Sequence, residues 1–254
     1  MAGRYPNTVF HFTDKKGLLG ILKNNFRISY AREKIVGSTL KREFGAPMVS
    51  FCDLRLSEVS DHMKAYGKYG IGMSKTWANS NGLNPVCYLN TPCRLNDNLI
   101  GAIDDFFKHL NNIQSVSQHQ AMSTAYMNLM DMYRYIKNYE GELWRNGILK
   151  NPNFRFANER EWRYVPSLIG DLFPFVPLSA INTSAKKATA NARYASSPLE
   201  FGPSDIRYII VRKDSERDEI IKKIFLANTL KYGSVQAQRM ASRILTAEQI
   251  NDDI

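Results

Sequence analysis

The sequence predicts an α+β fold, and three observations lead to this prediction. The 254 residues have an ordinary globular balance, 44% hydrophobic and 23% charged. Segments of strand-like composition lie near both ends of the chain, and a helical pattern occupies 95–146 between them. No linker rich in Gly, Pro or Ser divides the chain. We therefore expect a single α+β domain over 1–254 that carries a helical insertion at 95–146.

Short runs of β-branched and aromatic residues, bounded by turn residues, predict the strands. They lie at 8–12, 26–30, 48–52, 85–89, 161–165 and 206–211. The first strand leads into a helix that Thr13 or Asp14 caps and that continues to about Asn24.

The remaining helices are predicted at 57–66, 97–112, 215–228 and 234–245, with one more inside the insertion. That one rests on an apolar stripe at spacings of four and three, which is typical of an amphipathic helix. The stripe consists of Met122, Tyr126, Leu129, Tyr133 and Ile136. The small, polar and basic segment 182–198 predicts a long surface loop.

Charge and cysteine usage limit the class of protein. The net charge is +10, and residues 1–75 hold 13 lysines and arginines against 6 acids. This fits a nucleic-acid partner or an anionic cofactor, or simply a solvated basic surface. The cysteines Cys52, Cys87 and Cys93 form no Cys-x-x-Cys pair, which favours reduced thiols and a cytoplasmic protein. No signal-peptide pattern and no run of roughly 18 apolar residues occurs, so no membrane partner is expected.

The first candidate site is His11-Phe12-Thr13 at the end of the first strand. On a strand, His11 and Thr13 point to the same side, here where a helix begins. The free N–H groups of a helix N-terminus favour phosphate, so this pair would suit the ribose or amide of a nucleotide. The alternative is a histidine satisfied by backbone groups and a threonine that caps the helix.

The second candidate is the run NEREWRY at 158–164. On a strand, Glu159, Glu161 and Arg163 would share one face, with Trp162 and Tyr164 packed on the other. In an open cleft, two carboxylates could bind a ribose hydroxyl and stabilise positive charge on a sugar. The alternative is a solvent-facing edge strand with alternating charges.

The third candidate is the glycine-rich run YGKYGIGMSK at 66–75. Glycines allow the backbone to approach a ligand closely, and Tyr66 or Tyr69 could stack on an aromatic ring. Lys68 and Lys75 could neutralise a diphosphate. The spacing matches neither a Walker loop nor a dinucleotide fingerprint, and the alternative is a turn packed by aromatic side chains. No metal site is predicted, because no acid or cysteine falls at ligand spacing from His109 or His119.

Five segments together resemble the bacterial abortive-infection family AbiGi. They are VFHFT, MVSFCDLRLSEVSDHMKAYGKYGIGMSK, GLNPVCY, NEREWRY and DIRYIIV, and their order covers most of the chain outside the helical insertion. The family is named as the antitoxin half of a phage-resistance system, so the resemblance implies a role in phage defence.

A more distant resemblance, to the ADP-ribosyltransferase fold, implies a split-sheet core that binds NAD in a cleft. His11 and Thr13 would then hold the nicotinamide-side ribose or amide, and Tyr66 or Tyr69 would stack on the nicotinamide. By the same resemblance, Glu161 would contact the ribose 2′-hydroxyl. Glu159 would orient or deprotonate the acceptor, and Arg163 would hold a phosphate or fix the carboxylates.

Two functions follow as hypotheses. The first is a phage-defence effector that transfers ADP-ribose from NAD, with nucleic acid as a possible acceptor. The second is a non-catalytic antitoxin or regulator that binds a cognate toxin protein or nucleic acid. A nuclease is a weaker third possibility, because no carboxylates are spaced as in a two-metal site. An open cleft lined by His11, a tyrosine and Glu161 would favour the transferase.

Overall fold

A computed structural model describes residues 6–91, 93–145, 147–167 and 174–253. Over this part of the chain, the main sheet has eight strands in the order β12-β11-β4-β1-β3-β10-β5, with β2 paired to β3. Their bounds are β1 Thr8–Thr13, β2 Ser29–Val36, β3 Lys41–Cys52, β4 Tyr69–Ser74, β5 Asn84–Pro85, β10 Glu161–Tyr164, β11 Ile206–Val211 and β12 Ile244–Thr246. Neighbouring strands are antiparallel except for the parallel pair β11–β12.

The sheet consists of two halves that meet at one point. Strand β1 pairs with β4 over six residues but with β3 only through Phe10 and Cys52. On the far side of that joint, β3 pairs with β10 and extends beyond it as a long hairpin with β2. Two small sheets lie outside the main one, formed by β6 Cys87–Leu89 with β7 Ile136–Asn138 and by β8 Gly141–Arg145 with β9 Ile148–Phe154.

Helices cover both faces of the first half of the sheet. The largest core cluster lies under α1 (Lys15–Asn24), α3 (Lys75–Ser80), α7 (Arg217–Tyr232) and α8 (Ser234–Ala241), with Leu18 and Ile224 among its buried members. A second cluster, which includes Phe10 and Met63, lies under α2 (Ser60–Tyr66) and α9 (Ala247–Asp253). No helix in the described residues is long and apolar enough to cross a bilayer.

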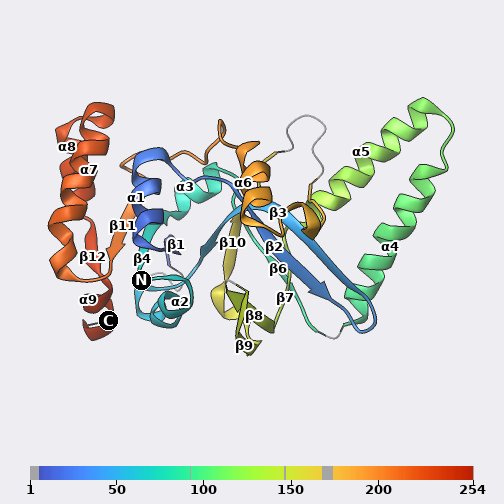
Figure 1. The fold of residues 1–254 in the computed structure, drawn as a ribbon, viewed down its shortest axis with the longest axis horizontal. Coiled ribbons are helices and arrows are strands. Elements are labelled where there is room, and N and C mark those ends of the chain that lie inside the picture. Colours follow the sequence, from blue (N-terminus) through green and yellow to red (C-terminus); the bar gives the residue numbers. More distant parts are fainter. Residues whose placement is uncertain (1–5, 92, 146, 168–173, 254) are drawn as a thin grey trace.

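The second half of the sheet carries the arm, which we define as the helices α4 (Arg94–Asn111) and α5 (Val116–Tyr133). The arm projects from the body at the opposite end from α7 and α8 (Figure 1). Its base packs on the β2–β3 hairpin through a third cluster in which Phe44, Ile103 and Tyr133 are buried. Asp97 of α4 also accepts hydrogen bonds from the backbone of Ser38, Thr39 and Leu40 at the hairpin tip, at 2.9–3.2 Å.

Several predicted elements need correction. The strand expected at 26–30 begins only at Ser29, because the backbone of Phe26 forms an isolated bridge with Leu199. The expected loop 182–198 contains helix α6 (Ser184–Ala192), since the Thr183 side chain caps it at the N–H of Lys186. The last helix predicted at 234–245 ends at Ala241, and β12 and α9 follow it.

The glycine-rich run 66–75, considered above as a place where the backbone approaches a ligand, lies largely in the sheet. From Tyr69 onward it forms β4, a central strand whose six residues are all buried. A Cβ atom at Gly70 or Gly72 would lie 2.8 or 2.7 Å from ring atoms of Phe12 or Phe10. These two glycines therefore make room for phenylalanine rings of the neighbouring strand, not for a ligand.

Candidate functional site

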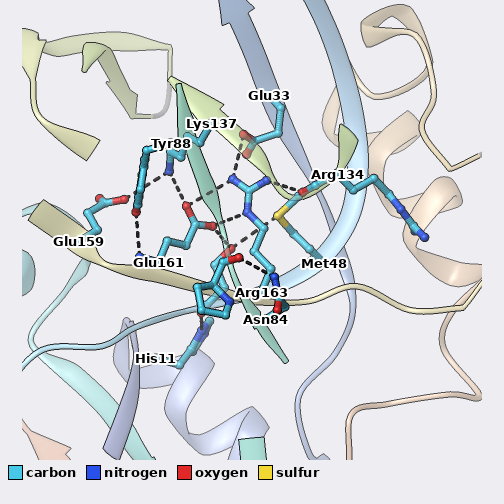
Figure 2. Close-up of polar contacts among 12 residues, drawn as sticks. His11, Glu33, Met48, Asn84, Tyr88, Arg134, Lys137, Glu159, Glu161 and Arg163 are labelled. Atoms are coloured by element: carbon cyan, nitrogen blue, oxygen red, sulfur yellow. Dashed lines mark hydrogen bonds and ion pairs between the residues drawn. The ribbon is translucent and has the colours of Figure 1, made fainter. Parts of the chain in front are cut away.

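The site is built around Arg163 and Glu161, which alternate along β10 and therefore share one face of the sheet. Arg163 is fully buried and Glu161 is 5% exposed. The Arg163 guanidinium donates from Nε to Oε1 of Glu161 at 2.7 Å and from Nη2 to Oε2 at 3.3 Å (Figure 2). The backbone that carries both side chains is fixed, because β10 pairs with β3 on one side and, at Trp162 and Arg163, with β5 on the other.

A lysine that the sequence did not indicate joins this pair. Lys137 lies on β7, directly after the arm, and its ammonium donates to Oε2 of Glu161 at 2.7 Å. It also reaches Oε2 of Glu159 at 3.2 Å and lies 4.6 Å from the ring centroid of Phe156. Lys137 thus brings the two carboxylates of the Glu-x-Glu motif together.

Arg163 extends the network to the β2–β3 hairpin and to the base of the arm. Its Nη2 donates to Oε2 of Glu33 on β2 at 3.0 Å. Its Nη1 donates to the backbone carbonyl of Arg134, the residue that follows α5, at 2.6 Å. A single buried guanidinium therefore holds β10, β2 and the end of the arm together.

Glu159 is not on the strand face that the sequence predicted. It ends a 3-10 turn over Phe156–Glu159, and Arg160 then adopts a left-handed conformation with φ of 44°. Its carboxylate nevertheless faces Lys137 and accepts a hydrogen bond from the Tyr66 hydroxyl. The expectation that Trp162 and Tyr164 pack on the other face is confirmed.

The charges in the network set the pKa of each group. Burial alone would raise the pKa of Glu161, but Arg163 and Lys137 outweigh it and lower that pKa well below the usual range. Burial would likewise lower the pKa of Lys137, yet Glu161 and Glu159 raise it well above its usual range. Because its folded-state pKa is depressed, Glu161 contributes stability above its unfolded-state pKa and loses it as pH falls toward the folded-state value.

His11 reaches the network through Ser50 of β3. Its Nδ1 lies 2.8 Å from the backbone carbonyl of Ser50, so this nitrogen carries the ring proton and donates it. The Ser50 hydroxyl in turn donates to Oε1 of Glu161 at 2.8 Å. The imidazole packs against Phe26 and Phe51, and burial lowers its pKa, which favours the neutral ring at pH 7.

Thr13 and Tyr69 do not join this cluster. Thr13 contacts the first turn of α1, where a Cβ atom at Gly17 would lie 2.1 Å from its Oγ1. Asp14, not Thr13, caps that helix. The buried Tyr69 donates its hydroxyl to Oε2 of Glu216 at 2.6 Å, on the other half of the molecule.

Half-buried aromatic rings lie at the rim of the network. Tyr66 stacks on His62 with ring centroids 4.2 Å apart, while its hydroxyl reaches Glu159. The Tyr88 hydroxyl accepts a hydrogen bond from the backbone N–H of Glu161 at 2.8 Å. Tyr88 lies in GLNPVCY, but no spacing in that run relates it to β10. Lys75, considered earlier as a diphosphate ligand, instead pairs with Asp53 at 2.7 Å.

The carboxylate of Glu161 has no acceptor site left. Oε1 accepts from Ser50 and from Nε of Arg163, and Oε2 accepts from Lys137 and from Nη2 of Arg163. Four donors match the roughly four lone-pair positions of a carboxylate. A sugar hydroxyl can hydrogen-bond to Glu161 only by displacing one of these donors.

Two cavities among the described residues lie away from this network. One of about 290 Å³ is lined by Asp131, Arg134 and Pro166, and another of about 330 Å³ by Phe44, Tyr126 and Phe175. Both are at the base of the arm, and neither is lined by Glu161 or His11. Among the described residues, no group of three or more His, Cys, Asp or Glu is placed to bind a metal ion.

Comparison with known proteins identifies the family. Residues 24–212 match the family model described as "Putative abortive phage resistance protein AbiGi, antitoxin". This chain belongs to the AbiGi family. It is 28% identical over 233 residues to the abortive phage resistance protein AbiGi of Lactococcus lactis subsp. cremoris, covering 85% of this chain and 92% of that protein. No solved structure matches.

The AbiGi match places the network within the part of the chain that defines the family. Glu33, Ser50, Lys137, Glu161 and Arg163 all lie inside 24–212, as does the whole arm. His11 and Thr13 precede the matched region, and α7, α8 and α9 follow it. The family match supports the role in abortive phage resistance that the sequence indicated.

Replacing Arg163 with Met should strongly destabilise the AbiGi fold. The change leaves the buried carboxylates of Glu161 and Glu33 without their guanidinium, which typically costs about 3–5 kcal/mol. Urea unfolding followed by circular dichroism measures the free energy of unfolding.

Arg160→Met is the matched control. Arg160 lies three residues away and pairs with Glu58 at the surface, so its loss should cost no more than about 1 kcal/mol. Equal losses in the two variants would contradict the role assigned to Arg163.

Proposed function

We propose that this chain is the antitoxin-type component of an abortive-infection system and acts by binding a partner protein through the arm. The family description supports an antitoxin with a cognate toxin as its partner. The observation that carries the proposal is the composition of the exposed end of the arm. Between Lys108 and Asp131, no residue is Asp, Glu, Lys or Arg.

Such a surface is unusual for a solvated helix and fits a protein interface. An exposed helix normally carries charges on its outer face, whereas the centres of protein interfaces are depleted of charged residues. The first two turns of α5 are exposed almost throughout. Val116 is 83% exposed and Met122 is 40% exposed, beside polar Gln, Ser and His side chains. The occupant that fits is a partner protein with an apolar, weakly charged contact surface.

On this proposal, the buried network serves to hold the arm in place. Arg163 binds the carbonyl that follows α5, and Lys137 secures the next strand to Glu161 and Glu159. At the next residue, the Asn138 side chain both accepts from the N–H of Val36 and donates to its carbonyl, at 2.8 and 2.9 Å. A preorganised arm loses less conformational entropy when its partner binds.

An NAD-dependent ADP-ribosyltransferase is the second candidate, and one observation favours it. The histidine of β1, the tyrosine Tyr66 and the carboxylates of Glu159 and Glu161 converge where the two halves of the sheet meet. This agrees with the order implied by the resemblance to the ADP-ribosyltransferase fold. One of its four donors, from Ser50, Lys137 or Arg163, would have to release Glu161 before it could contact a ribose hydroxyl. A nucleic-acid acceptor belongs to this candidate and would draw on the basic N-terminal third.

The antitoxin proposal is tested by placing charges on the arm. Val116→Glu and Met122→Glu together, introduced into the native gene, should reproduce the growth or phage-sensitivity phenotype of a deletion. Both side chains are exposed, so the protein should still fold and accumulate; immunoblotting and a thermal melt check this.

Ile148→Glu is the matched control for that experiment. It adds a charge at another exposed apolar residue, 57% exposed on β9, and should behave as wild type. Wild-type behaviour of the arm variant would contradict docking through the arm.

The two candidates also differ in their response to NAD. If Glu161 is structural, calorimetry should detect no NAD binding, and labelled NAD should leave no label in protein, RNA or DNA of an infected-cell lysate. Incorporation of label by the wild type, lost in a folded Glu161→Gln variant, would replace the antitoxin proposal with the transferase and identify the acceptor class.

A further inference from the structure

The helical hairpin formed by α7 and α8 has a mostly basic outer surface, because its two acidic residues, Asp218 and Glu219, both lie in the first turn of α7. From Ile220 to Ala247, the chain contains no Asp or Glu. Its exposed cations are Lys222, Lys223, Lys231 and Arg239. Among the described residues, none of these four takes part in a salt bridge. Of the two acids in the first turn of α7, Glu219 pairs with Lys15, so positive charge predominates on this surface.

Large apolar side chains protrude among these cations. Leu226 is 77% exposed, Leu230 98% and Val235 73%. In α7, Ile220 and Ile224 are buried against the sheet, whereas Leu226 and Leu230 lie one turn apart on the outer side. Lys222 is one further turn before Leu226, so cation and leucines follow one line along the helix. Leu226 and Leu230 stay exposed to water, so folding does not require a leucine at either position.

We propose that the outer surface of α7 and α8 binds the surface of an anionic lipid bilayer. A membrane interface accommodates both kinds of side chain that this surface exposes. Cations are attracted to anionic headgroups, and the leucines enter the boundary of the acyl chains. This contact lies at the surface and needs no membrane-spanning helix.

Other occupants fit the surface less well. A second copy of this chain would bring two predominantly basic surfaces together, which is unfavourable. Nucleic acid would leave Leu230, almost fully exposed, without an apolar environment. A folded acidic protein would need separate pockets for three singly protruding side chains, whereas fluid lipid adapts to their shape.

The surface is independent of the arm. The α7–α8 hairpin lies at the opposite end of the molecule (Figure 1) and outside the residues 24–212 that match the AbiGi family. The membrane contact would therefore hold the chain at a bilayer surface, while the family region binds its partner. The membrane proposal and the antitoxin proposal can each be correct without the other.

Vesicle co-sedimentation tests the proposal with the full chain. The wild-type protein should sediment with vesicles of phosphatidylglycerol and phosphatidylethanolamine but not with pure phosphatidylcholine, and added salt should weaken binding. Leu226→Ser with Leu230→Ser, and separately Lys222→Glu with Lys223→Glu, should each weaken binding at least about tenfold. Val116→Ser with Met122→Ser, on the arm, is the matched control and should bind as wild type.

Three results would overturn the proposal. The first is no binding of the wild type to the anionic vesicles. The second is unchanged binding in both α7 variants, which would place any lipid contact elsewhere. The third is that a labelled DNA duplex binds the wild type but not the lysine variant, whereas the lysine variant still binds vesicles as the wild type does. This result would assign the surface to nucleic acid. Thermal melts establish that each variant is folded.

Discussion

The ion pair between Arg163 and Glu161 is the interaction on which the second half of this molecule depends. An arginine with no exposed surface and a glutamate with 5% can exist inside a protein only when their hydrogen-bonding groups are satisfied. That requirement recruits Lys137, Ser50, Glu33 and the carbonyl of Arg134 from separate segments. Satisfying one buried pair thus fixes the relative positions of β10, β3, β2, β7 and the base of the arm.

The same requirement limits what Glu161 can do. A catalytic carboxylate needs a free lone pair or proton position directed at the substrate, and both oxygens of Glu161 are occupied by protein donors. The convergence of His11, Tyr66 and Glu159 on this point keeps the transferase as a distinct hypothesis. The exposed end of the arm, which has no Asp, Glu, Lys or Arg between Lys108 and Asp131, requires no such rearrangement to act. For this reason partner binding accounts for the AbiGi chain more simply than transfer of ADP-ribose.

Local pattern was enough to locate part of the site. Glu161 and Arg163 were predicted to share a face because strand geometry places alternate residues together, and the structure confirms this. Lys137, Glu33 and Ser50 were missed, since their contacts join segments 24 to 130 residues apart and leave no periodic signal. The split-sheet, ADP-ribosyltransferase-like core stays a prediction.

The glycine-rich run 66–75 shows a second limit of predicting a site from the sequence. Glycine signals that backbone and another group approach closely, but the sequence does not say what that group is. At Gly70 and Gly72 it is a phenylalanine ring of β1, and Tyr69 is directed to Glu216. The helix α6 was missed because its small, polar residues show no apolar stripe; Thr183 caps its start.

Hydrogen–deuterium exchange on Lys137→Met tests most directly whether the network holds the arm. The account predicts faster exchange in β7 and in the last turns of α5, with β1 and β4 unchanged. Lys150→Met, at an exposed lysine of β9, should leave the whole pattern as in wild type. If Lys137→Met leaves α5 and β7 as protected as before, or loosens β1 and β4 equally, the central claim is contradicted.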